Sequence, residues 1–354
     1  MSIQRRENGT YVVRWNEGGR KRGRTFDRRR DAEKFEAEVR RRRAMGGIVV
    51  IPEPVTLAEL YARYLASKAH REKNTRDGYA AMWKHLEPRL GRVPVQQISP
   101  AAVEALGPEM IRDGVGVTSA NKAIGLLSSM LNRAVVWGYV DRNPCQYVER
   151  PRTARTRKIE PLSPAQVESI RARMNLRDRT LVSVLAYAGL RPGEALALTW
   201  EDVGNTIRVD KAVAHGEVKT TKNRLARNVT LLPALRRDLD EYRMSLGRPE
   251  SGLVFPNGGG EPWSDTKYRN WRTRYFEPAV EAASFTNATP YTLRHSFASL
   301  LLASGAPTTE VAYEMGHGIG VLVSTYAHVI AEFRGNGTID PETQIVAARR
   351  RIAV

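Results

Sequence analysis

Two segments with the composition of linkers interrupt this chain of 354 residues. Residues 46–54 begin with two glycines and end with Pro-Glu-Pro, and residues 150–158 are basic and almost devoid of apolar side chains. A chain of this length exceeds one typical hydrophobic core, so such breaks are natural domain boundaries. The sequence therefore predicts three domains, over residues 1–50, 55–150 and 159–354.

The first of these domains has the signals of a small sheet backed by a helix. Residues 11–15 and 21–26 have strand character and flank a turn, and a helix with one apolar face is expected over residues 31–43. The 50-residue segment carries 15 basic against 7 acidic residues. A basic sheet backed by one helix fits the major groove of DNA, whereas the alternative is a charged tail in solvent. Because the strand, turn and helix signals agree, we favour a DNA-contacting domain.

Helical signals fill residues 55–150. Thr56 precedes a helical apolar face, Ser99 is placed to cap a helix, and Pro100 suits a first helical position. Apolar side chains recur at helical spacing over residues 74–86 and 118–136, which predicts a compact helical domain. The basic segment that follows either tracks a phosphate backbone or is a solvated connector, and both alternatives stay open.

The third domain combines many helices with a small antiparallel sheet. Strands are expected over residues 206–213 and 227–232, and Ser163, Pro164 and Gln166 form a helix-starting capping box. Further helices are expected over residues 180–188, 233–246, 265–282, 292–304, 308–315 and 319–326. The predicted fold class is mainly α with small antiparallel sheets, an α+β arrangement in a multidomain chain. The tail, residues 343–354, packs either on a neighbouring protomer or on its own domain.

Charge and cysteine content narrow the classes of function. Lys and Arg number 56 against 38 Asp and Glu, a net charge of +18 that attracts polyanions, nucleic acid first among them. The one cysteine, Cys145, allows no internal disulfide or thiolate metal cluster and suits a reducing compartment. No apolar run is long enough to span a membrane, so we expect a cytoplasmic protein with no membrane partner. The sequence also lacks metalloprotease and nucleotide-binding motifs, and we expect neither a metal nor a cofactor.

Four residues of the last domain are the parts needed to break a phosphodiester without a metal: Arg191, Arg294, His317 and Tyr326. Guanidinium groups can meet the negative charge that builds on the non-bridging oxygens. A tyrosine can attack and hold the phosphoryl group covalently. Taken singly, each residue has an ordinary structural interpretation: a cation near the end of a helix, a surface helix residue, a loop histidine and a core aromatic. Their order and spacing favour a site.

This order resembles that of the tyrosine recombinases, specifically the phage-type integrases. Residues 189–194 read Gly-Leu-Arg-Pro-Gly-Glu, residues 291–295 read Tyr-Thr-Leu-Arg-His, and residues 315–317 read Met-Gly-His, nine residues before Tyr326. The resemblance implies that Arg191 and Arg294 bind the phosphate, that His317 donates to it and that Tyr326 is the nucleophile. It also implies an arm-binding role for residues 1–50 and a core-site-binding role for residues 55–150.

The resemblance further implies a lysine, near the turn of the small sheet, that protonates the leaving oxygen. Lys222 is preferred for its spacing before Arg227, and Lys219 is the alternative; both lysines could instead merely neutralise phosphate. The family usually has histidine where this chain has Tyr291. A phenol is a poor base near neutral pH but can donate a hydrogen bond, so we expect Tyr291 to position the phosphate. Glu194 and His295 are expected to orient the arginines and neighbouring helices and are not assigned as catalytic.

The function that the resemblance implies is site-specific recombination. The enzyme would cleave and rejoin DNA through a 3′-phosphotyrosyl intermediate, and so integrate or excise a mobile element such as a viral genome. A homotetramer on paired attachment sites is implied, with a directionality factor and a DNA-bending protein as expected partners. The alternatives are strand relaxation by a type IB topoisomerase and a DNA-binding protein without catalysis. The small basic first domain argues against relaxation, which needs no second DNA address.

Overall fold

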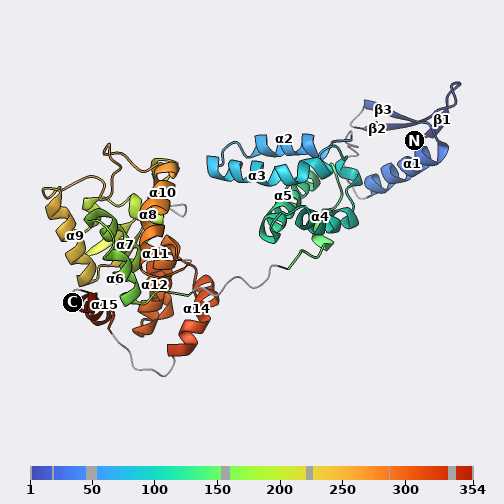
Figure 1. Cartoon of the computed structure of the whole chain (residues 1–354). Coiled ribbons are helices and arrows are strands. Elements are labelled where there is room, and N and C mark those ends of the chain that lie inside the picture. The colour runs from blue at the N-terminus through green and yellow to red at the C-terminus, as the bar shows by residue number, and fades with distance from the viewer. Residues whose placement is uncertain are drawn as a thin grey trace. The chain divides into compact units, whose positions relative to one another are not determined.

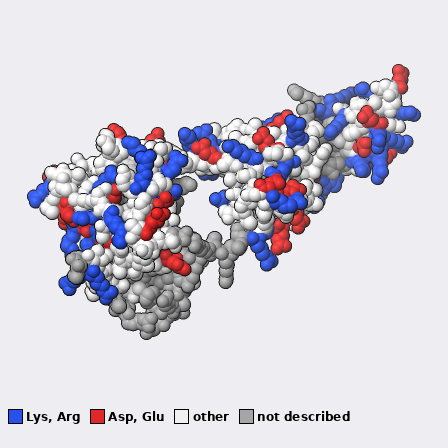
Figure 2. Space-filling model, viewed as in Figure 1, with Lys and Arg blue, Asp and Glu red and all other residues white. Residues whose placement is uncertain are grey.

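The computed structural model describes residues 2–17, 20–44, 54–152, 160–220, 226–286, 288–333 and 340–352. It divides into two compact units, residues 1–156 and 157–354 (Figure 1). Both units carry Lys and Arg side chains on the face shown in Figure 2. The predicted segment 46–54 and most of the basic segment 150–158 lie outside the described residues, and the three domain boundaries stay a prediction.

The first unit begins with a three-stranded antiparallel sheet in the order β1-β2-β3. Its strands are β1 (Ser2–Arg5), β2 (Tyr11–Glu17) and β3 (Arg20–Phe26), and helix α1 (Arg29–Ala44) follows. Val13 and Val39 are fully buried between sheet and helix, and the Phe26 and Phe35 rings lie 5.0 Å apart. The two predicted strands and the helix are confirmed; β1 is additional, because four mostly exposed residues leave no alternating pattern to detect.

A bundle of helices completes the first unit. Thr56 caps its first helix in a capping box with Glu59, and Ser99 accepts a hydrogen bond from the backbone N–H of Ala102. Tyr61 stacks on Trp83 at 4.2 Å, over a core of buried leucines. The elements are α2 (Leu57–Ser67), α3 (Lys73–Leu90), α4 (Pro100–Arg112) and α5 (Val117–Val136), with short helices η1 (Val95–Gln97) and η2 (Pro144–Tyr147). The expected helices of residues 55–150 are thus confirmed, and their forming a separate domain stays a prediction.

The second unit packs its helices around α7 (Leu176–Tyr187), which contacts α6, α9 and α12 (Figure 1). The capping box of Ser163 and Gln166 is confirmed at the start of α6. Every residue of α7 from Thr180 onward is buried, as expected of a helix read as wholly internal. The other helices are α6 (Pro164–Arg171), α8 (Pro192–Leu196), η3 (Trp200–Asp202), α9 (Pro233–Ser245), α10 (Asp265–Trp271), η4 (Arg272–Phe276), α11 (Glu277–Ala282), α12 (Pro290–Ala303), α13 (Thr308–Met315), α14 (Ile319–Phe333) and α15 (Pro341–Ile352).

The predicted single sheet of the second unit is instead two pairs of strands. β4 (Thr206–Val209) pairs with β7 (Arg227–Thr230), and β5 (Lys211–Ala214) pairs with β6 (Glu217–Thr220). The expected strand over residues 206–213 is divided between β4 and β5, because the chain changes sheets after Val209. β6 was missed because β5 is evenly half-buried and β6 is mostly exposed, so the hairpin shows no alternation.

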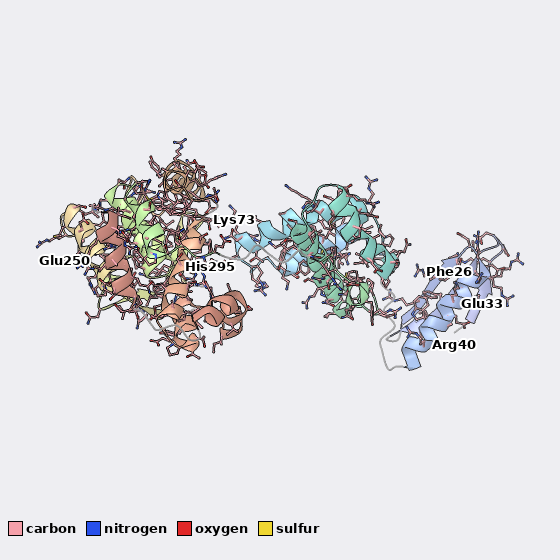
Figure 3. All side chains as sticks on the ribbon, turned by 60° about the horizontal axis from the view of Figure 1, so that its bottom comes forward. Phe26, Glu33, Arg40, Lys73, Glu250 and His295 are labelled. Carbon is pink, nitrogen blue, oxygen red and sulfur yellow. The ribbon has the colours of Figure 1, made fainter. Side chains whose placement is uncertain are left out.

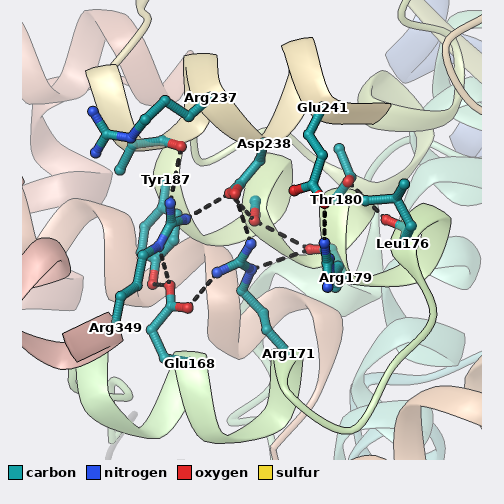
Figure 4. A network of polar contacts seen from close by, with 12 residues as sticks. Glu168, Arg171, Leu176, Arg179, Thr180, Tyr187, Arg237, Asp238, Glu241 and Arg349 are labelled. Atoms are coloured by element: carbon teal, nitrogen blue, oxygen red, sulfur yellow. Dashed lines mark hydrogen bonds and ion pairs between the residues drawn. The ribbon is translucent and has the colours of Figure 1, made fainter. Parts of the chain in front are cut away.

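The C-terminal helix α15 folds onto its own domain in this structure, where it contacts α6 and α9. Ile345 is fully buried. Arg349 bonds Glu168 at 3.2 Å and Asp238 at 2.6 Å, within the network of Figure 4. Of the two placements considered for the tail, the structure has the one within the same chain. Across the described parts of the chain, no helix is both long and apolar enough to cross a membrane.

Candidate active site

The site begins where α7 ends. Gly189 adopts a left-handed conformation, with φ of 59°, and a Cβ there would lie 2.3 Å from the Phe297 ring. Only glycine satisfies both constraints without strain. The chain can then turn so that Arg191 becomes the N-cap residue of α8, with Pro192 at the first helical position. The short helix places Glu194 one turn further on, directly beneath Arg191.

Glu194 is a buried carboxylate at the centre of several guanidinium groups. It accepts hydrogen bonds from Arg191 at 2.8 Å and from both Nη atoms of Arg227, at 3.0 and 2.7 Å. The Arg294 Nη1 atom lies 3.9 Å away. Burial acts to raise the pKa of Glu194, but the hydrogen bonds and charge of Arg227 and the backbone N–H of Arg191 lower this pKa to about 2. The expectation that Glu194 orients the arginines agrees with these contacts.

Arg294 is only 2% exposed. Its guanidinium donates to the backbone carbonyls of Gly189 and Met315, and Nη2 lies 3.1 Å from Nε2 of His317. Burial and the charge of Arg191 lower the pKa of Arg294 to about 9, so the group still carries its charge at neutral pH. A buried cation held mainly by neutral carbonyls is in an environment that an anion would improve.

His317 follows the left-handed glycine, φ 58°, that ends α13. Burial and the charge of Arg294 lower the pKa of His317 to about 4, so the imidazole is neutral. Because Arg294 donates to Nε2, the network assigns the ring proton to Nδ1. This Nδ1 is buried without a partner in the described part of the chain. His317 therefore presents a hydrogen-bond donor that none of the described residues uses.

A cavity of about 770 Å³ lies beside these side chains, and Arg294 is not among the residues that line it. Arg191, Arg227 and His317 contribute to its wall, and Tyr291, whose side chain is about half exposed, lies at its edge. Gly316 closes the wall, and its carbonyl accepts a hydrogen bond from Arg191 at 2.8 Å. The cavity is basic, open to solvent and wide enough for a phosphodiester. The described residues contain no group of side chains suited to holding a metal ion.

Tyr326 lies behind this wall. It is 1% exposed, it does not line the cavity, and its hydroxyl is 2.5 Å from Nδ1 of His295. Its backbone, with φ of −113° and ψ of 15°, is not helical, so α14 consists of two helical segments that meet at Tyr326, where the sequence predicts the helix to end. Burial raises the pKa of the phenol although Arg294 acts to lower it. The structure thus brings Arg191, Arg294 and His317 together, with Tyr291 beside them and the Tyr326 hydroxyl turned inward.

The lysine position is only partly described. Lys222, the preferred candidate, lies outside the described residues. Lys219 stands in β6 directly opposite Ala212 of β5, and Ala212 lines the cavity. Val213, which points to the opposite face of the same strand, lines the cavity as well, whereas Lys219 is not among the lining residues. Its Nζ lies 3.1 Å from Glu217.

Two contacts of the site were not predicted from the sequence. In the sequence, Arg227 is used only to measure the spacing of Lys222. In the structure it is buried and bound to Glu194 and to the Glu314 carbonyl. The period-two burial of β7, in which Arg227 and Val229 both point inward, was the available signal. The bond between His295 and Tyr326 joins residues 31 positions apart, and no local pattern announces it.

Comparison with known proteins places this geometry in a family. Residues 160–332 match the model of the phage integrase family. An integrase of Streptomyces ambofaciens is 29% identical over 83% of this chain and 81% of its own length. The tyrosine recombinase XerD of Pseudomonas aeruginosa is 34% identical over 54% of this chain and 64% of its own length. The match to the prophage integrase IntR of Escherichia coli covers 57% of that protein, so the chain spans less than two thirds of two of these relatives.

Solved structures share the fold. The Tn1549 transposon integrase in complex with a circular intermediate DNA superposes with a TM-score of 0.67, over 77% of this chain and 95% of that one, at 19% identity. A lambda integrase dimer bound to a core site gives a TM-score of 0.63 over 81% and 99%, at 18% identity. The fold is that of these integrases. Residues 160–332 of the chain belong to the phage integrase family.

Proposed function

We propose that this protein is a site-specific DNA recombinase that integrates or excises a mobile element, such as a viral genome, in the cytoplasm of its host. The observation that carries the proposal is the buried excess of guanidinium charge beside a cavity with an unused imidazole donor. A DNA phosphate would supply the missing negative charge and accept the Nδ1 proton of His317 in a hydrogen bond.

The proposed reaction uses these side chains together with Tyr326. Arg191 and Arg294 hold the scissile phosphate, and the Tyr326 oxygen attacks phosphorus. The bond from phosphorus to the 5′ oxygen breaks as the bond to Tyr326 forms, which leaves a 3′-phosphotyrosine and a free 5′ hydroxyl. A 5′ hydroxyl of a partner duplex then attacks that linkage and releases the tyrosine. Two such exchanges join two duplexes, and they require several protomers, which we take to be a homotetramer on paired attachment sites.

Tyr326 must leave its buried position before it can attack. The break in helical geometry at this residue makes α14 the element whose movement would deliver the hydroxyl to the cavity. We propose that binding of the duplex favours this movement, because the phosphate then offers the phenol a new partner. Residues 1–50 and 55–150 would hold arm-type and core-type DNA, and a directionality factor and a DNA-bending protein would set the direction.

The departing 5′ oxygen needs a proton, and Lys219 and Lys222 are the candidates. Lys222 is preferred for its spacing before Arg227, and Lys219, on β6, is the alternative. A substrate with sulfur at the bridging 5′ position distinguishes them, because a thiolate leaves without protonation. The lysine that acts as acid is the one whose replacement by alanine slows cleavage of the oxygen substrate but leaves cleavage of the sulfur substrate unchanged.

The test of the function is trapping on a nicked suicide duplex. The wild-type protein should be retained on the DNA as a covalent adduct, and Tyr326→Phe should bind the same duplex without forming it. An adduct that persists in Tyr326→Phe would remove this residue from its role. Incubation with plasmids that carry paired attachment sites should then yield joint molecules. Relaxed plasmid without joint molecules would instead indicate a topoisomerase.

A further inference from the structure

His295 makes a contact that its expected orienting role does not require. It lies on α12 directly after Arg294, in the second unit (Figure 3). Its Nδ1 is 2.5 Å from the Tyr326 hydroxyl, and the two ring centroids are 5.6 Å apart. The hydroxyl is the atom that must lose a proton when it attacks phosphorus. An imidazole nitrogen at hydrogen-bond distance is placed to receive that proton.

The other side chains near the phenol are poor acceptors. Arg294 has no acceptor atom, and the Nε2 of His317 already faces the Arg294 guanidinium. Both carboxylate oxygens of Glu194 receive hydrogen bonds from Arg227 and Arg191. Tyr291, at the position where the family usually has histidine, is half exposed at the edge of the cavity. Among the described residues around the site, only His295 has an acceptor atom at hydrogen-bond distance from the Tyr326 hydroxyl.

We propose that His295 is a catalytic residue that takes the phenolic proton of Tyr326 during cleavage and returns it during rejoining. The inference rests on the proposed recombinase function. In the forward step α14 carries Tyr326 to the phosphate with Oη still within hydrogen-bond reach of His295 Nδ1, and the proton moves from Oη to Nδ1 while the bond from Oη to phosphorus forms and the bond to the 5′ oxygen breaks. In the reverse step the incoming 5′ hydroxyl gives its proton to the lysine that served as acid in the forward step, and the imidazolium protonates Oη as the hydroxyl oxygen displaces it.

The surroundings of His295 couple this proton transfer to DNA. Burial and the charge of Arg294 lower the pKa of His295. The imidazole is therefore neutral in the free protein, and one of its nitrogens is unprotonated and can accept a proton. The neighbouring charged or titratable groups, Arg294, His317 and Tyr326, supply no negative charge at neutral pH. A DNA phosphate bound by Arg294 offsets the nearby positive charge, and an imidazolium at His295 then becomes less costly. The base therefore gains strength when substrate is in place.

The decisive comparison is between two replacements of His295. His295→Gln keeps a polar partner for the phenol but cannot take its proton at neutral pH, whereas His295→Ala removes both functions. If His295 is the proton acceptor, both variants should form the covalent adduct about 10²–10³-fold more slowly than wild type in single turnover. DNA binding measured by gel shift should remain within a few-fold of wild type. Recovery of wild-type rate in His295→Gln would overturn the proposal and leave only a hydrogen-bonding role.

Chemical rescue provides a readout that a structural role would not move. Imidazole added to His295→Ala should enter the vacated space and restore part of the cleavage rate, in proportion to its neutral form. The same addition should leave Tyr326→Phe and Arg294→Ala inactive. A fluorinated tyrosine at position 326, whose phenol is more acidic, should reduce the defect of His295→Ala. Wild-type rates in both His295 variants, or a defect that neither imidazole nor the acidic phenol changes, would refute the assignment; failure of wild-type protein to form any adduct would instead refute the recombinase function.

Discussion

The second unit holds two buried ionic clusters that are built from the same residue types but differ in net charge. The Glu194 cluster gathers three arginines around one carboxylate: Arg191, Arg227 and Arg294 with Glu194. The α15 clasp of Figure 4 pairs two arginines with two carboxylates: Arg171 and Arg349 with Glu168 and Asp238. The first cluster has an excess of positive charge, and the second is neutral.

This difference in charge balance distinguishes a binding site from a purely structural cluster. In the α15 clasp each guanidinium contacts both carboxylates, so the cluster satisfies itself and fixes the C-terminal helix. In the Glu194 cluster, Arg294 relies on backbone carbonyls, and Arg191, about one third exposed, reaches a carbonyl across the cavity wall. Buried charge without a counter-charge is costly unless a ligand supplies one. The unbalanced cluster is therefore the one organised for an anion.

The largest expected contrast is between Arg294 and Arg349. Arg294→Ala should slow covalent adduct formation by at least about 10²–10³-fold, because the variant lacks a cation aimed at the charge of the transition state. Arg294→Lys should recover little, since an ammonium cannot reproduce the planar fork. Arg349→Ala should retain cleavage within a few-fold but lose about 1–3 kcal/mol of unfolding free energy, because Glu168 and Asp238 lose a partner. Single-turnover trapping and urea unfolding measure the two quantities; equal effects on cleavage would erase the distinction.

A second contrast concerns Glu194, the sole carboxylate of its cluster. Glu194→Gln should lower the unfolding free energy at neutral pH by about 3–5 kcal/mol, because three arginines then lack a counter-charge. The pKa of Glu194 is lowered from 4.5 to about 2, so its stabilisation is complete above pH 4.5 and is lost as the pH falls through 2. The difference between variant and wild type should therefore narrow in acid.

Sulfate sharpens this test, because it resembles phosphate in charge and shape. It should restore more stability to Glu194→Gln than to wild type. Glu241→Gln is the matched control, since Glu241 is half exposed in its pair with Arg179 and should change stability by less than about 1 kcal/mol. A Glu194→Gln variant as stable as this control would show that the cluster does not depend on its carboxylate.

The two clusters also show what sequence can predict. Residues 308–315 were expected as a helix, and α13 has those bounds; Ser163 and Gln166 form the expected capping box. Such elements are set by neighbours along the chain. The spacing of the motifs predicts that Arg191, Arg294 and His317 belong to one site. The fold brings these three side chains together. Neither ionic cluster could be assembled in advance, because its members come from helices and strands that meet only in the folded domain.

Burial was the least predictable property of the site. Arg227 and Arg294 are long basic side chains, which are ordinarily exposed, and here both are buried. Tyr326 was expected beside the arginines, but its hydroxyl faces His295 behind the cavity wall. A sequence pattern identifies which residue types meet a substrate. It does not give the resting position of a group that must move to react.

The smallest expected effect is at Tyr291, which lies at the edge of the cavity. Tyr291→Phe removes one hydroxyl from a half-exposed side chain, so the cleavage rate should fall by about tenfold or less, or ~1.4 kcal/mol. An unchanged rate would show that Tyr291 does not position the phosphate. Tyr291→His installs the residue usual in the family, and its effect depends on which group takes the phenolic proton. If His295 does so, a histidine at position 291 should leave wild-type cleavage within a few-fold and should not rescue His295→Ala by more than the imidazole added in solution.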